Sequence, residues 1–270
     1  MVVIISLSFF IGSTHEVLTY KDPQFSVSSF PEVAVSAESF EIFDIETGTE
    51  LASKNSHQPM PIASVTKLIT ASALLDQEGI DTHHTLTADD IEGNGRAGKL
   101  GVGEDYSSRE LLLPLLLESS NDAGGALHRL HPNILNTMNA YAQSLGLTQT
   151  EFSDTTGLSP NNTATGHELS ILLKSLFETK RYLFDLTTLS ETYGAHTGWK
   201  NNNPVSLLPG FKGGKHGFTE ASGRTLVAVF GETLGGGKSR DIGYVLLKSN
   251  NLKADIELLR KEVVKNVEFK

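Results

Sequence analysis

β-rich runs lie towards both ends of this chain, and the segment between them has mainly helical periodicity. The predicted strands are residues 39–44, 50–53, 206–208, 211–215 and 225–231, and the predicted helices are 64–77, 108–118, 122–130, 134–145, 167–177, 239–247 and 253–265. The first two strands form a hairpin around Thr47-Gly48. Strands from both ends flanking a helical middle favour one antiparallel sheet. We therefore predict an α/β fold of the α+β kind, with an antiparallel sheet flanked by helices and an all-α lobe.

The composition is that of a folded enzyme and excludes several other functions. The 270 residues, 39% hydrophobic and 20% charged, are enough to bury one sizeable core. The formal net charge of -10 argues against a nucleic-acid partner, because binding to a phosphate backbone requires a basic face. The absence of cysteine excludes disulfides, thiolate catalysis and zinc–thiolate sites.

Ser64-Val65-Thr66-Lys67 sets a hydroxyl and an amine three residues apart at the start of a predicted helix. On a helix, both side chains project from the same face. An amine kept neutral by its surroundings can accept the serine proton and make the hydroxyl a good nucleophile. Free N–H groups in the first helical turn also favour developing negative charge. The pattern indicates nucleophilic catalysis without histidine, and it needs support from other segments because short motifs recur by chance.

Two later segments supply that support. A leucine-rich helical run, preceded by a predicted capping box of Ser107 and Glu110, delivers Ser119 and Asn121 at its end. Residues 213–219 read Gly-Gly-Lys-His-Gly-Phe-Thr and lead into a β-rich run. They place a lysine on a strand beside glycines, which allow a ligand to approach the backbone closely.

In this order, the three segments resemble the penicilloyl-serine transferases, whose motifs are Ser-x-x-Lys, Ser-Asp-Asn and Lys-Thr-Gly. The chain is most similar to the serine D-alanyl-D-alanine carboxypeptidases, the low-molecular-mass penicillin-binding proteins of the peptidase S11 type. Residues 61–68, 118–123 and 152–158 add to the similarity, which extends from about residue 36 to about residue 259. It implies a two-lobed β-lactamase/transpeptidase-like fold. The sheet lobe would be residues 31–63 and 200–270 and the helical lobe 64–199, with a cleft between them.

The resemblance implies a role for each matching residue. Ser64 would attack the carbonyl between the last two D-alanines of a peptidoglycan stem peptide, and water would later release the acyl-enzyme. Lys67 would be the general base, and Ser119 would relay a proton to the leaving D-alanine amine. Asn121 would hold the acyl side of the substrate, and Lys215 would attract its terminal carboxylate.

The strand after Lys215 is implied to complete the substrate site. Backbone N–H groups of Ser64 and Phe218 would form the oxyanion hole, beside Gly217. The chain departs from the family at His216, which stands where relatives have a threonine or serine that helps to bind the carboxylate. Either an N–H of this histidine replaces the hydroxyl, with Thr219 nearby, or its side chain points away from the cleft.

Several alternatives to a carboxypeptidase can be compared with the sequence. β-Lactams resemble acyl-D-Ala-D-Ala, so we expect them to be covalent inhibitors. A β-lactamase is less favoured, because the nearest candidate for its deacylation glutamate, Glu168, is typical of a first helical turn. A D,D-endopeptidase, which would cut at a cross-link instead of at the terminal D-alanine, is also less favoured. A function of another class, a penicilloyl-binding sensor or weakened peptidoglycan binder, is suggested by His216 and by the N-terminus.

The N-terminal segment, Met1–Ile11, is almost wholly apolar, but it is shorter than the roughly 20 residues that span a bilayer and has no basic leader. It is either the remnant of a signal or membrane anchor, or a segment packed on the domain. The implied substrate lies outside the cytoplasmic membrane, which favours the first. We therefore expect residues 1–30 to be an anchor remnant and tether, residues 31–270 to be a single catalytic domain, and the location to be extracytoplasmic.

No metal or cofactor is predicted. Residues 93–98 match the dinucleotide string G-x-G-x-x-G, but no strand precedes them, so we predict a loop. His83 and His84 are adjacent and do not share a ligand face, and residues 235–237 are typical of a turn. Trp199 and residues 201–203 either border the cleft or form a surface turn.

Overall fold

A computed structural model describes residues 24–27, 30, 34–91 and 98–269. Its centre is an antiparallel sheet in the order β10-β11-β12-β2-β3. The strands are β10 (Phe211–Thr219), β11 (Gly223–Thr233), β12 (Ser239–Ser249), β2 (Ser39–Asp44) and β3 (Glu50–Lys54). Strands from the two ends of the chain meet where β12 pairs with β2. The predicted α+β class with an antiparallel sheet is confirmed.

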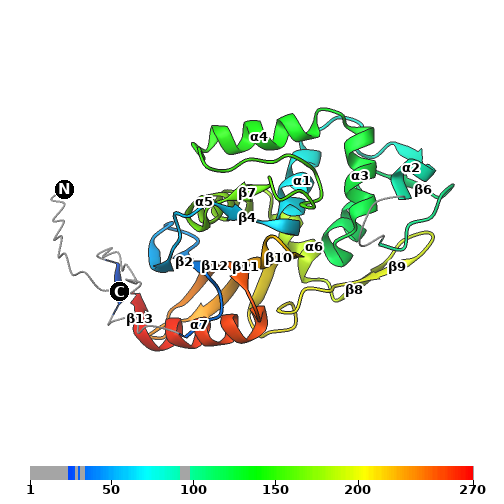
Figure 1. The fold of residues 1–270 in the computed structure, drawn as a ribbon. Helices are drawn as coiled ribbons and strands as arrows, with labels where there is room; N and C mark the ends of the chain where they lie inside the picture. The colour runs from blue at the N-terminus through cyan, green and yellow to red at the C-terminus, as the bar shows by residue number, and fades with distance from the viewer. Residues whose placement is uncertain (1–23, 28–29, 31–33, 92–97, 270) are drawn as a thin grey trace.

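Both faces of the sheet are covered by helices. Along β11, Leu226 and Phe230 belong to the apolar cluster that contains α7 (Leu252–Asn266), whereas Val227 and Val229 belong to the cluster that contains the other long helices. Figure 1 shows α7 along one side of the sheet and α1, α3 and α4 on the other side. Successive side chains of a strand point to opposite faces of the sheet, so the strands contribute to a hydrophobic core on each face.

The helical part lies between β3 and β10 in the sequence. Its helices are α1 (Thr66–Leu75), α2 (Ala88–Ile91), α3 (Asn121–Leu130), α4 (Ile134–Ser144), α5 (Gly166–Thr179) and α6 (Arg181–Thr188), with the 3₁₀ turn η1 (Ala63–Val65) and the π-helical turn η2 (Pro114–Glu118). The small pairs are β1 (Phe25–Val27) with β13 (Val267–Phe269), β4 (Met60–Pro61) with β7 (Thr163–Ala164), β5 (His83–Thr85) with β6 (Asp105–Ser107), and β8 (Glu191–Tyr193) with β9 (Gly198–Lys200).

The prediction of a helix over residues 239–247 is wrong, because this segment is β12 in the sheet interior. Tyr244 and Leu246 are buried in the α7 cluster, and Val245 and Leu247 are buried in the cluster on the opposite face. A strand buried on both faces is apolar throughout and has no polar alternation. Such a run cannot be distinguished from a buried helix by its periodicity.

Two other predicted elements differ locally. Residues 206–208 form a turn instead of a strand, since the N–H of Leu208 donates to the carbonyl of Val205 at 3.0 Å. The predicted helix 108–118 contains η2, which begins at Pro114; proline has no N–H to continue a preceding helical turn. The predicted capping contacts are present: Glu110 N–H donates to Ser107 Oγ at 3.2 Å, and Ser107 N–H donates to Glu110 Oε2 at 2.8 Å.

The remaining predicted elements occur within a few residues of their expected bounds, and residues 235–237 turn between β11 and β12 as predicted. Most of the expected N-terminal tether, and the loop predicted over 93–98 apart from Gly98, lie outside the described residues. Within the described part of the chain, no helix combines the length and apolarity required to cross a membrane.

Candidate active site

The three motif segments converge on one pocket of about 260 Å³ between η1, the end of η2 and β10. The pocket is lined by Ser64, Ser119, Asn121, Leu158, His216, Gly217, Phe218, Thr219 and Arg224. The two motif lysines, Lys67 and Lys215, are buried and contact the serines of the pocket. A wider depression of about 670 Å³ near Arg240 contains none of these residues. The structure therefore brings together all nine site residues expected from the sequence.

Lys67 is fully buried at the start of α1 and holds the centre of the site. Its Nζ lies 3.1 Å from Ser64 Oγ, 2.7 Å from Asn121 Oδ1 and 2.5 Å from the carbonyl oxygen of Thr156. Burial lowers the pKa of Lys67 to about 7, although the carboxylate of Asp154 acts in the opposite direction.

This geometry suits the neutral form of the amine. A neutral amine has two N–H donors and one lone pair, and the oxygens of Asn121 and Thr156 can only accept. With both N–H groups donated to these oxygens, the lone pair is left for the Ser64 hydroxyl, which carries a proton. The arrangement can therefore move the serine proton to Lys67.

A loop held by Asp154 positions the carbonyl that accepts from Lys67. The Asp154 carboxylate accepts from the backbone N–H groups of Thr156, Gly157 and Ser159 and from Asn162 Nδ2. Burial alone would raise the pKa of Asp154, but these donors hold it below its usual value. From the sequence, this segment was only a point of family similarity.

Gly157 lets this loop pack directly against the turn before Ser64. Gly157 has a φ of +81°, and a Cβ at this position would lie 2.0 Å from the carbonyl oxygen of Ala63. Ala63 itself has a φ of +48° in the left-handed region. On the other side, Thr225 Oγ1 on β11 donates to the carbonyl of Ile62 at 2.8 Å. The nucleophile is thus held by backbone contacts from a loop and a strand.

We expect Gly157→Ala to lower the free energy of unfolding by about 3 kcal/mol or more, since it adds backbone strain to a clash with main-chain atoms. The turn that carries Ser64 would also move, so acylation by penicillin should slow. Chemical denaturation and penicillin labelling measure the two effects. The matched control is Gly125→Ala on α3, where a Cβ meets no atom within 4 Å and alanine is expected to be neutral or stabilising. Equal stabilities of the two variants would contradict this account.

Ser119 ends η2 in the left-handed conformation, with a φ of +61°. Its Oγ accepts from Lys215 Nζ at 3.0 Å, and Lys215, which is 1% exposed, also donates to the carbonyl of His216 at 2.7 Å. A strained non-glycine residue that contacts a buried cation is typical of a functional position. The second hydroxyl and the second amine of the site are therefore in direct contact.

Trp199 and the asparagines after it support the segment before Ser119. Trp199 is buried and donates from Nε1 to the carbonyl of Gly98 at 2.7 Å. Asn202 donates from Nδ2 to the carbonyl of Glu118 at 2.7 Å and from its N–H to that of Leu117 at 3.0 Å. These residues are not among those that line the pocket.

The end of β10 forms the other wall of the pocket. A Cβ at Gly217 would lie 2.6 Å from the backbone nitrogen of Ser64, so a side chain here would crowd that amide. His216 is half-buried and lines the pocket, as does Thr219, whose hydroxyl contacts Ser222. Sequence reasoning missed Arg224, which pairs across the hairpin with Phe218 and places its guanidinium 5.1 Å from that ring. The Ala221-Ser222-Gly223 turn between two β-rich runs was the signal for this pairing.

Comparison with known proteins identifies the family of this chain. Residues 24–234 match the model of peptidase family S11, described as D-alanyl-D-alanine carboxypeptidase. A D-alanyl-D-alanine endopeptidase of Escherichia coli (strain K12) is 30% identical over 225 residues, covering 75% of this chain and 69% of the relative. A D-alanyl-D-alanine carboxypeptidase of Mycobacterium tuberculosis is 28% identical over 205 residues, covering 72% of this chain and 70% of the relative.

A solved structure, that of penicillin-binding protein D2 from Listeria monocytogenes in its ampicillin-bound form, has the same fold. The TM-score is 0.75 at 23% identity, and the match covers 87% of this chain and 100% of the other. The matched range of this chain, residues 24–234, includes Ser64, Lys67, Ser119, Asn121 and Lys215. The chain belongs to the D-alanyl-D-alanine carboxypeptidase family of serine peptidases, S11, hydrolases with the fold of the penicillin-binding proteins.

Proposed function

We propose that this protein removes the terminal D-alanine from peptidoglycan stem peptides through an acyl-enzyme on Ser64. The observation that carries the proposal is the contact of Ser64 Oγ with the buried amine of Lys67, whose pKa of about 7 leaves much of it neutral near neutral pH. Membership of the carboxypeptidase family supplies the substrate class.

The first step is attack by Ser64 Oγ on the carbonyl between the two D-alanines, with the serine proton passing to Lys67. The negative charge that develops on the carbonyl oxygen is stabilised by the N–H groups of Ser64 and Phe218, a kind of donor worth about 10²–10³ in rate. Gly217 keeps the Ser64 amide uncrowded. Asn121, which contacts Lys67, holds the acyl side of the substrate.

The second step is departure of D-alanine. Ser119, which lines the pocket, passes its hydroxyl proton to the leaving amine and receives in exchange the proton that Lys67 took from Ser64, so Lys67 is neutral again when D-alanine leaves. The terminal carboxylate is attracted by the positive charge of Lys215 and by Arg224, with His216 and Thr219 supplying N–H and O–H donors at the same wall. Water then attacks the acyl-enzyme carbonyl and gives a proton to Lys67, and Lys67 returns that proton to the departing Ser64 oxygen, which restores the free enzyme.

The proposed substrate, peptidoglycan, lies outside the cytoplasmic membrane, so we propose an extracytoplasmic location. Residues 1–30 would be an anchor remnant and tether, and residues 31–270 would be one catalytic domain. β-Lactams would acylate Ser64, since a penicillin-binding protein of the same fold is known in an ampicillin-bound form. A second candidate activity is cleavage of cross-links, which is favoured by the similarity to an E. coli endopeptidase.

The test is to incubate the protein with a stem peptide ending in D-Ala-D-Ala and, separately, with a cross-linked muropeptide dimer. D-alanine release and dimer cleavage are measured against the Ser64→Ala variant. Release of D-alanine from the stem peptide supports the carboxypeptidase, and cleavage of the dimer alone supports the endopeptidase. If neither substrate is turned over but fluorescent penicillin labels the protein stoichiometrically, the proposed enzymatic activity is wrong. The protein would then be a penicilloyl-binding sensor.

We expect His216→Ala to raise KM for the stem peptide by about 10-fold, because a hydrogen bond to a charged group contributes about 1.5–3 kcal/mol. His216→Thr restores a donor and should lie between that variant and the wild type. Steady-state D-alanine release measures both, with exposed His128→Ala as the control. An unchanged KM in His216→Ala would show that this side chain does not face the carboxylate. A many-fold gain in His216→Thr would show that the histidine is a handicap.

A further inference from the structure

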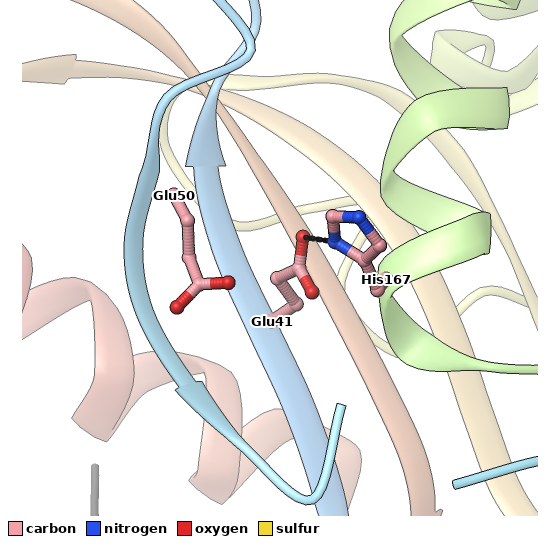
Figure 2. Close-up of side chains that lie close together, drawn as sticks. All are labelled: Glu41, Glu50 and His167. Carbon is pink, nitrogen blue, oxygen red and sulfur yellow. Dashed lines mark hydrogen bonds and ion pairs between the residues drawn. The ribbon is translucent and has the colours of Figure 1, made fainter. Parts of the chain in front are cut away.

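A second group of titratable side chains lies at the sheet edge opposite β10. Glu41 on β2, Glu50 on β3 and His167 in the first turn of α5 each offer one ligand atom, and these atoms all lie within 4.8 Å of one another. Figure 2 shows the three side chains gathered between the two strands and the helix. None of them lines the Ser64 pocket, and the acyl-transfer chemistry does not use them.

Glu41 is the buried member of the group, with 1% of its surface exposed. Its Oε1 accepts from His167 Nδ1 at 3.2 Å and from Ser170 Oγ at 2.6 Å. Its Oε2 is buried and has no hydrogen-bond partner. A carboxylate oxygen buried without a donor is destabilising, and a cation bound beside it would remove that cost.

Two carboxylates and one imidazole lie close together at this point. Glu50 and Glu41 are close enough to interact: burial raises the pKa of Glu50, and the Glu41 carboxylate acts in the same direction. The hydrogen bond to Glu41 raises the pKa of His167. Two carboxylates can balance the charge of one divalent cation, and binding of the ion would release the protons held by the group.

The chemical types of the ligand atoms indicate which class of cation would bind. Calcium and magnesium prefer oxygen ligands alone, whereas zinc accepts imidazole nitrogen together with carboxylate oxygen. Two ligands of a tetrahedral zinc, each bound at roughly 2.0–2.1 Å, lie about 3.3 Å apart. His167 Nδ1 and Glu41 Oε1 lie 3.2 Å apart, so zinc could take the place of the proton that now lies between them.

The surroundings also resemble those of a metal site. Ser170 orients Glu41, and Ser53 Oγ donates to Glu50 Oε1 at 2.8 Å, as outer residues do for metal-ligating carboxylates. The ring of His57 lies 4.8 Å from that of His167 and brings a second imidazole close to the group. Glu50 is only partly buried, so its side chain can move to close the site.

We propose that Glu41, Glu50 and His167 form a binding site for a divalent transition metal, with Zn²⁺ as its ligand. The bound ion would link β2, β3 and α5. It would therefore stabilise the edge of the sheet formed by β3, which is the edge opposite β10. The proposal stands independently of the acyl-transfer function.

The test uses the full chain freed of metal with a chelator and then titrated with Zn²⁺ alone, by calorimetry and by thermal unfolding. The wild type is expected to bind one ion and to show a higher Tm with zinc. Glu50→Gln and His167→Gln should each weaken zinc binding by about 10-fold or more and lose the Tm gain. Glu50→Gln changes a partly exposed side chain and is expected to fold. If His167→Gln does not fold, zinc binding by Glu50→Gln is the deciding test.

The matched control is His83→Gln, in an exposed group where His83 lies 3.1 Å from Asp105 and 3.7 Å from Glu110. It should bind zinc like the wild type. No binding by the wild type at millimolar zinc would overturn the proposal, as would equal binding by the wild type, Glu50→Gln and His167→Gln. Loss of binding in His83→Gln alone would place the ion at the wrong cluster, and Mg²⁺ binding as tight as Zn²⁺ binding would exclude a transition-metal site.

Discussion

Lys67→Arg is expected to slow acylation by penicillin and release of D-alanine by about 10²–10⁴-fold, the usual contribution of a general base. Arginine keeps a positive charge at this position but cannot be deprotonated in a protein, so it offers no lone pair to the Ser64 hydroxyl. The lower rate would therefore result from the loss of proton transfer and not from the loss of a positive charge. Single-turnover labelling with fluorescent penicillin measures it.

The same experiment has a pH signature. Because the active form of Lys67 is the neutral amine and its pKa is about 7, the acylation rate of the wild type should rise as the pH increases through 7 and then level off. Lys67→Arg should lack this rise. The control, Lys261→Arg on the exposed side of α7, should match the wild type in both rate and pH profile. A wild-type acylation rate that does not change through neutral pH would contradict Lys67 as the base.

Ser64→Ala is expected to abolish the covalent adduct with penicillin and to reduce D-alanine release by on the order of 10⁴-fold or more. The substitution removes the atom that forms the acyl bond. It should leave the fold intact, because the hydrogen bond of the hydroxyl to the described residues is the one with Lys67 and the residue is only partly buried. Intact-protein mass spectrometry after penicillin treatment measures the adduct.

The prediction for Ser64→Ala has a matched control and an outcome that would contradict it. Ser144→Ala, an exposed serine at the end of α4, should retain the full adduct and the full rate. An adduct on Ser64→Ala of the same mass as on the wild type would show that another hydroxyl, such as that of Ser119 in the same pocket, is the nucleophile.

Local sequence rules predicted elements with one polar face and failed where both faces are buried. The helices α3, α4, α5 and α7 show apolar periodicity because one side of each meets solvent. In contrast, β12 has no such asymmetry and was predicted as a helix. Its strand pairing with β2 joins residues about two hundred positions apart, a contact that no local pattern encodes.

By itself, the sequence determined the three motif segments, the α+β class and the family, because the chemistry of acyl transfer requires particular residue types at short spacings. Only the tertiary structure decided what surrounds them: the Asp154 loop and Gly157 against the turn of Ser64, Arg224 in the pocket wall, and the Glu41–Glu50–His167 group at the opposite edge. These contacts join segments far apart in the chain. They arise from packing and hydrogen bonding in the folded state, which leave no fixed spacing in the sequence to be recognised.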